Sequence, residues 1–160
     1  MNTLVLESRK TSLEQKTAVY TIGYEGRGLE EFASRLKDFG IEVLVDVRDV
    51  PLSRKKGFSK TPLSQYLEEE GIDYIHLKSL GSPKDIRDKV KTDGDYEYFY
   101  TAYSSYIKSQ QDSVKTLHQI VVNSSVCIMC YERDPYSCHR LVVAEEVNKK
   151  DGNGLAVQHI

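Results

Sequence analysis

The sequence has no continuous apolar run near the roughly 18 residues that a membrane-spanning helix requires. Its 160 residues are 39% hydrophobic and 29% charged, which is typical of a globular protein. Residues 1–16 mix charged and polar groups with Leu and Val, so they lack the apolar segment of a secretory signal. We therefore expect a cytoplasmic protein without membrane contact, with residues 1–16 as an N-terminal extension and residues 17–160 as one α/β domain.

Cysteine is scarce, with only three residues in the chain, Cys127, Cys130 and Cys138. An odd number in a chain without an export signal argues for reduced cysteines rather than a disulfide framework. Excess charge of one sign is also missing. The net charge of -2 gives no overall electrostatic attraction to nucleic acid or to an acidic membrane.

Apolar segments of two periodicities alternate along the chain. Short β-type runs occupy residues 18–22, 41–47, 72–77, 126–129 and 155–160. Helical patterns occupy residues 29–39, 63–70, 85–90, 96–107, 113–122 and 141–147, with an exposed loop expected at 91–95. This alternation predicts an α/β fold with three layers, in which helices flank a mostly parallel, Rossmann-like sheet of about five strands.

Ionisable residues follow the apolar strands at the point where each strand ends. Parallel strands carry their carboxyl ends at one edge of a sheet, where open α/β folds bind their ligands. A fold that needed only a core would gain nothing from collecting costly polar groups there. The residues expected to converge are Tyr24, Glu25, Asp46, Arg48, His76, Cys130 and Glu132.

The densest cluster lies in residues 125–140, where Cys138 falls at the expected start of the last helix. A helix N-terminus favours the thiolate form of a cysteine. Successive helical residues point about 100° apart, so His139 is expected to be poorly placed as a direct base for Cys138. Phosphatase and rhodanese loops carry an arginine six residues after the cysteine, where this chain has Tyr136 and Ala144, so both reactions are disfavoured.

Zinc is another possible use of these side chains, with Cys130, Cys138 and His139 as ligands and Cys127 or His76 in addition. The seven-residue gap between Cys130 and Cys138 fits no standard zinc spacing. Cys127 lies in an apolar strand, where a free cysteine usually acts as a small hydrophobe. We therefore prefer a metal-free interpretation and expect no cofactor.

One loop is locally basic, because residues 50–65 carry four cations and no acidic side chain. The cations are Arg54, Lys55, Lys56 and Lys60, with Phe58 among them. Such a loop can hold a phosphate or a nucleic-acid strand. A solvated surface loop explains the same composition equally well.

Four segments in order resemble the motifs of the family known as domain of unknown function 488: TIGYEGR, LVDVRDVPLSR with KKGFSK, YIHLKSLG, and CYERDPYSCHR. The resemblance runs from about Tyr20 to the C-terminus and implies a small cytosolic α/β domain of prokaryotic type, with no established reaction. Ser82 follows Gly81 where many members have a second glycine. The resemblance carries over Gly23, Asp46, Arg48, Pro51, Ser53, Arg54, Leu80, Gly81, Cys130, Glu132, Cys138, His139 and Arg140.

We interpret the cluster as the site of an enzyme that acts on a phosphate-bearing substrate, such as a nucleotide or a nucleic-acid derivative. Arginines would hold the anion, a carboxylate would act as general acid or base, and a cysteine would be nucleophile or support. The expected catalytic residues are Asp46, Cys130, Glu132 and Cys138. The expected substrate-binding residues are Tyr24, Arg48, Arg54, His76, His139 and Arg140.

Two other functions remain open at this point. The chain can be a non-catalytic nucleic-acid-binding module that uses the basic loop 54–60, in which case its affinity would fall steeply with salt. Alternatively, Cys138 can be a redox sensor, which requires a thiol with a depressed pKa.

Overall fold

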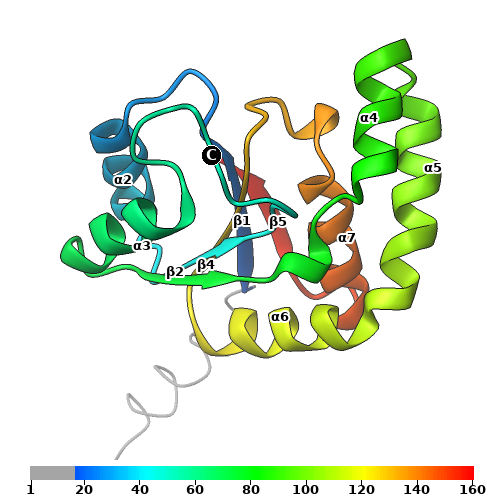
Figure 1. Ribbon diagram of the computed structural model, residues 1–160. Coiled ribbons are helices and arrows are strands. Elements are labelled where there is room, and N and C mark those ends of the chain that lie inside the picture. The colour runs from blue at the N-terminus through cyan, green and yellow to red at the C-terminus, as the bar shows by residue number, and fades with distance from the viewer. Residues whose placement is uncertain (1–16) are drawn as a thin grey trace, which may run out of the picture.

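The computed structural model describes residues 17–160, which form a five-stranded parallel sheet with helices on both faces (Figure 1). The strands are β1 (Ala18–Gly23), β2 (Val43–Asp46), β3 (Asp73–His76), β4 (Val126–Cys130) and β5 (Ala156–His159). Their order is β3-β2-β4-β1-β5, and every pairing is parallel. The predicted α/β fold is confirmed, and the sheet is wholly rather than mostly parallel.

The helices are α2 (Leu29–Asp38), α3 (Lys60–Glu69), α4 (Lys84–Asp93), α5 (Tyr96–Ile107), α6 (Gln111–Asn123) and α7 (Arg140–Lys150). In Figure 1, α2 and α3 lie on one side of the sheet and α7 on the other, with α4 and α5 paired beyond α7. No helix of residues 17–160 has the length and apolar character to span a bilayer. The predicted extension, residues 1–16, lies outside the described residues, and the assignment of 17–160 to one domain stays a prediction.

Two apolar layers sandwich the sheet, and β4 supplies both of them. Val126, Ile128 and Cys130 belong to the layer under α5, α6 and α7. Cys127 and Met129 belong to the opposite layer, under α2 and α3. Both sets are buried, as expected for a central parallel strand. Cys130 therefore ends the strand on the side where α7 begins.

The second half of α4 is the part of the fold that differs from the sequence prediction. Residues 91–93, expected in a loop, continue the helix until Gly94, which adopts the left-handed conformation at φ 67°. This last turn is exposed and is stabilised by an ion pair between Lys89 and Asp93 at 3.1 Å. It carries no buried apolar residue, and hydrophobic periodicity therefore could not reveal it.

The loop after β3 approaches the loop after β2 at Gly81, which follows the 3₁₀ turn η1 (Lys78–Leu80). A Cβ atom at Gly81 would overlap the backbone of Asp49. This contact holds the start of α4 against the carboxyl edge of the sheet. Only glycine allows it.

We predict that Gly81→Ala destabilises the fold by about 1–3 kcal/mol, because the added methyl group forces two backbone segments apart. Gly28→Ser is the matched control, since a Cβ at Gly28 would contact nothing within 4 Å and serine is a good residue at the helix N-cap. Urea unfolding of the three proteins measures both effects. Equal stability of Gly81→Ala and wild type would show that the two loops do not pack as described.

Candidate functional site

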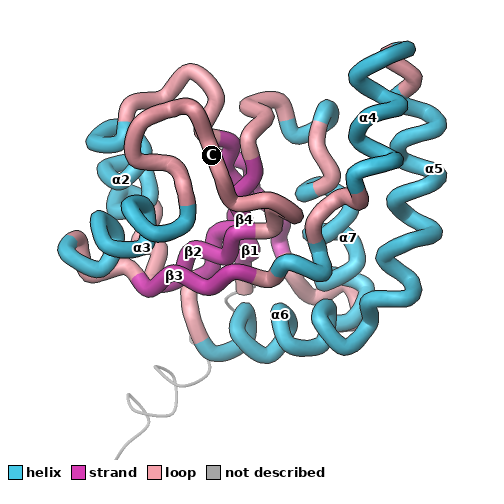
Figure 2. The backbone as a smooth tube through the Cα atoms, in the orientation of Figure 1, coloured by secondary structure: helices cyan, strands magenta, loops and turns pink. Residues whose placement is uncertain are grey.

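A pocket of about 540 Å³ lies at the carboxyl edge of the sheet. The loops that follow β1, β2 and β4 gather on this side of the molecule (Figure 2). Helices α4 and α5 contribute Arg87, Val90, Lys91, Tyr96 and Phe99 to its lining. A cavity therefore lies at the edge where polar residues were predicted to gather, and a ligand-binding role for these residues stays a prediction.

Most of the predicted site residues line this pocket. They are Tyr24, Arg48, Arg54, Cys130, Glu132, Cys138 and His139. Three other predicted residues, Asp46, His76 and Arg140, do not line the pocket. They form hydrogen bonds with other parts of the chain instead. Their assigned roles in catalysis and substrate binding stay predictions.

A buried ion pair supports the pocket wall. Nε of Arg48 donates to Oδ1 of Asp46 at 2.9 Å, and Nη2 donates to Oδ2 at 2.8 Å. The same carboxylate accepts a hydrogen bond from the Tyr74 hydroxyl, and Nη1 of Arg48 donates to the Tyr24 hydroxyl at 3.1 Å. The carbonyl of Arg48 contacts Nε2 of His76 at 2.7 Å. The guanidinium therefore joins the ends of β1 and β2, and the Asp46 carboxylate and the Arg48 carbonyl connect β3 to them.

The negative charge of Asp46 raises the pKa of two neighbouring groups, Arg48 and Tyr74. Burial alone would lower the pKa of Arg48, but hydrogen bonding to Asp46 and its negative charge outweigh that effect and raise the pKa. Burial also raises the pKa of Tyr74, and the neighbouring Asp46 carboxylate raises it further. Arg48 is thus a fixed cation, and Tyr74 a neutral donor, at ordinary pH.

Arg140 is almost fully buried, and its guanidinium binds the loop that follows β4. Nε donates to the Thr21 hydroxyl at 3.1 Å, and Nη2 donates to the carbonyl of Arg133 at 3.0 Å. Nη1 donates to the carbonyl of Glu132 and, at 3.3 Å, to Sγ of Cys130. Burial lowers the pKa of Arg140. These contacts make it a brace between β1, the loop and α7.

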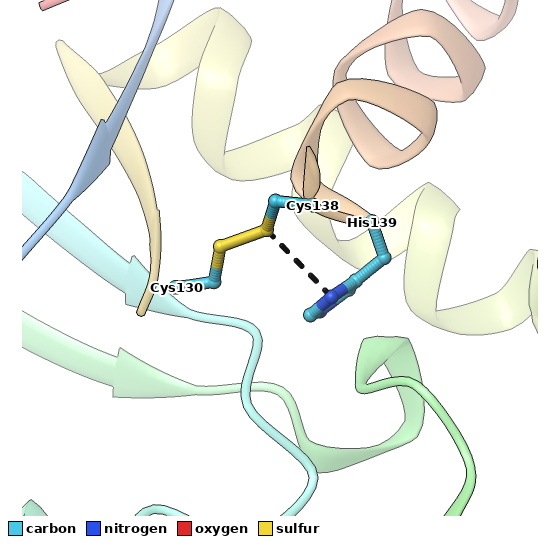
Figure 3. Close-up of side chains that lie close together, drawn as sticks. All are labelled: Cys130, Cys138 and His139. Carbon is cyan, nitrogen blue, oxygen red and sulfur yellow. Dashed lines mark hydrogen bonds between the residues drawn. A yellow bond between two sulfur atoms is a disulfide. The ribbon is translucent and has the colours of Figure 1, made fainter. Parts of the chain in front are cut away.

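Cys130 and Cys138 are joined by a disulfide on the pocket wall (Figure 3). The expectation of reduced cysteines is therefore not met for these two residues. Cys127 is free and buried in the sheet, and burial raises the pKa of its thiol. The residue count could not reveal the pairing, because it depends on the loop 131–137 bringing the start of α7 back to the end of β4.

The reason for expecting His139 to be poorly placed as a direct base for Cys138, the offset between successive helical residues, does not hold. Nδ1 of His139 lies 3.8 Å from Sγ of Cys138. Cys138 has extended backbone angles, φ −143° and ψ 146°, and α7 begins only at Arg140, so the helical offset of 100° does not apply. Nε2 lies 2.7 Å from the carbonyl of Val47, and burial lowers the pKa of His139 to about 4. The ring is neutral, donates through Nε2 and presents an unprotonated Nδ1 to the sulfur.

Sequence reasoning missed several polar residues of the pocket, among them Ser82, Arg87 and Lys91. Arg87 pairs with Asp49 at 3.0 Å, across the contact between α4 and the loop after β2. The Ser82 hydroxyl is buried and has no hydrogen-bond partner among the described residues. A charged helix such as α4 gives no sequence signal of the edge over which it packs, so Arg87 and Lys91 were not identifiable from the pattern alone.

The basic loop contributes less to the pocket than its composition suggests. Of its four cations, Arg54 lines the cavity. Lys55 instead packs its ammonium over the Phe58 ring at 5.6 Å and donates to the carbonyl of Tyr24 at 3.4 Å. Phe58 is fully buried and stacks on Tyr24 at 4.6 Å. The loop is a packed part of the fold rather than a free arm.

Comparison with known proteins gives one finding. The model of the family described as "Domain of unknown function DUF488" matches residues 28–147, three quarters of the chain. No match was found among curated proteins or among solved structures.

We predict that Arg48→Met destabilises the protein by about 3–5 kcal/mol, because it leaves the Asp46 carboxylate buried without its partner. Asp49→Asn is the control, since the ion pair of Asp49 with Arg87 is partly exposed and is worth about 1 kcal/mol or less. The free energy of unfolding in urea measures both. A cost for Arg48→Met no larger than that of the control would refute the bracing role of the pair.

Proposed function

Since the chain belongs to the DUF488 family, whose description assigns no activity, its function has to be inferred from the pocket, and we propose an enzyme that acts on a small phosphate-bearing substrate there. The convergence of four cations on one cavity supports this proposal. Arg48 and Arg54 lie in the loop after β2, and Arg87 and Lys91 lie on α4. Arginine and lysine side chains bind phosphate oxygens by charge-assisted hydrogen bonds.

The local charge favours an anionic ligand even though the whole chain is slightly acidic. Two carboxylates line the same cavity, Asp49 and Glu132. Asp49 is paired with Arg87, and burial raises the pKa of Glu132. The unpartnered hydroxyl of Ser82 offers a further polar contact to a bound oxygen.

The rest of the lining suits the organic part of a nucleotide-like substrate. Apolar and aromatic side chains contribute, namely Val50, Leu52, Val90, Tyr96, Phe99 and Tyr131. Several are exposed at the rim, and aromatic faces stack on nucleobases without sequence preference. A cavity of about 540 Å³ lies in the range of small-molecule sites, which is roughly 300–1,000 Å³.

The reactive end of the pocket is the wall formed by Cys130, Glu132, Cys138 and His139. Glu132 lies beside Cys130, with Oε2 at 3.4 Å from Sγ. Partial burial raises the pKa of the Glu132 carboxyl group, and a carboxyl group beside the reacting atoms can donate or accept a proton. In this proposal Glu132 serves as general acid or base, the two sulfurs face the reacting group, and Asp46 acts by holding Arg48.

We predict that the protein binds nucleoside monophosphates, and that Arg54→Ala and Lys91→Ala each weaken binding roughly tenfold or more. Lys89→Ala is the matched control, because Lys89 lies on the same helix but pairs with Asp93 instead of lining the cavity. Isothermal titration calorimetry with a nucleotide panel measures the affinities. If no phosphate compound binds, or if the control loses as much affinity as the two variants, the proposal fails.

The same preparation tests the nucleic-acid-binding module. Binding of a single-stranded oligonucleotide that falls steeply with salt, and falls again in Lys55→Ala and Lys56→Ala, would favour the module over the enzyme. The packing of Lys55 against Phe58 speaks for the enzyme, because it removes one of the loop's cations from the free surface.

A further inference from the structure

We propose that Cys130, Cys138 and His139 form a binding site for a zinc-type divalent cation when the two cysteines are reduced. The two Sγ atoms and a ring nitrogen of His139 all lie within 4.8 Å of one another, and all three residues are buried. Figure 3 shows the imidazole turned toward the sulfur of Cys138. The inference rests on this geometry and not on the phosphate ligand proposed above.

The separations suit a tetrahedral ion. Zinc binds sulfur at about 2.3 Å and imidazole nitrogen at about 2.0–2.1 Å, which places its ligand atoms roughly 3.5–3.8 Å apart. Nδ1 of His139 is already 3.8 Å from Sγ of Cys138. The Cα atoms of Cys130 and Cys138 are 7.4 Å apart, so rotation of the side chains can bring the reduced sulfurs to the same separation. The spacing of the three ligand residues in the sequence did not indicate a zinc site, because they meet through the fold of the loop and not through a local motif.

The histidine is oriented as a metal ligand. Nε2 lies 2.7 Å from the carbonyl of Val47, which fixes the hydrogen on Nε2 and leaves the lone pair of Nδ1 directed at the sulfurs. A backbone carbonyl that accepts from the second ring nitrogen is the usual support of a metal-binding histidine. The end of β2 thereby sets the ring orientation.

Both sulfurs have N–H donors that stabilise thiolates. Nη1 of Arg140 lies 3.3 Å from Sγ of Cys130, and the backbone N–H of Arg140, at the start of α7, lies 3.4 Å from Sγ of Cys138. Metal binding requires deprotonated cysteines, and a cation or helix N-terminus promotes deprotonation. Two thiolates and one imidazole form a soft ligand set that favours zinc over magnesium or calcium.

The fourth coordination position would open to the pocket, because all three ligand residues belong to its lining. Zinc with three protein ligands and one open position is the arrangement of catalytic rather than structural zinc sites. Glu132, next to Cys130, would lie close to a water on that position. The metal would therefore face the same cavity as the four cations.

The disulfide and the metal site are mutually exclusive states of one pair of cysteines. Two molecules of a monothiol supply the two electrons and two protons that convert the disulfide to two thiols, and they leave as their own disulfide. Zinc then replaces the two thiol protons, which pass to solvent. Oxidation would remove the site.

The test uses the full chain, reduced with a phosphine, freed of metal with a chelator and titrated without oxygen with Zn²⁺ or Co²⁺. We expect about one equivalent of zinc, and with Co²⁺ the visible absorption of tetrahedral thiolate ligation. Cys138→Ser and His139→Gln should each weaken zinc binding at least tenfold. Cys127→Ala, which removes the free cysteine on the other face of the sheet, should bind like wild type.

Several outcomes would overturn the proposal: no zinc bound to reduced wild type, a Co²⁺ spectrum without thiolate bands, or wild-type affinity in Cys138→Ser. Circular dichroism reports whether the variants fold. If a variant unfolds, oxidised wild type replaces it as the comparison and must bind no zinc. Nucleotide titration of the metal-free protein is read separately, so failure of the metal site and failure of the proposed function give different results.

Discussion

The buried ion pair between Asp46 and Arg48 is the interaction on which the pocket depends. A buried guanidinium is tolerable only when its charge and its donors are matched, and Asp46, with hydrogen bonds on both oxygens, supplies that match for Arg48. The pair also reaches Tyr24 after β1 and Tyr74 on β3. The ion pair between Asp46 and Arg48 thus sets the relative positions of three strand ends, and Arg48 also lines the cavity.

The opposite wall depends on how closely β1 approaches the loop after β4. Gly23 makes this approach possible, because a Cβ there would overlap the carbonyl of Glu132. Arg140 then holds the same loop through the carbonyls of Glu132 and Arg133. The loop turns the chain so that Cys138 returns to Cys130 at the end of β4. Backbone packing, rather than sequence spacing, therefore brings the sulfurs together.

Local patterns in the sequence were sufficient to predict how strands and helices alternate along the chain. They also indicated the edge of the sheet at which polar residues gather. They were sufficient because β-type runs and helical periodicity report burial, and parallel strands share one carboxyl edge. They did not reveal Arg87 and Lys91, which α4 brings to the cavity from an exposed helix with little apolar signal. They also misplaced His139, since the extended backbone of Cys138 delays the start of α7.

The pocket lining combines cations with a cluster of sulfur and carboxyl side chains. Arg54 and Lys91 are among the cations, and Cys130, Cys138 and Glu132 form the cluster. The most direct measurement is a crystal structure of the reduced protein grown with zinc and a nucleoside monophosphate, recorded at the zinc absorption edge. We expect anomalous density between Cys130, Cys138 and His139, with a phosphate beside the cations of the same cavity. An empty pocket, with the nucleotide and the metal bound elsewhere or not at all, would contradict it.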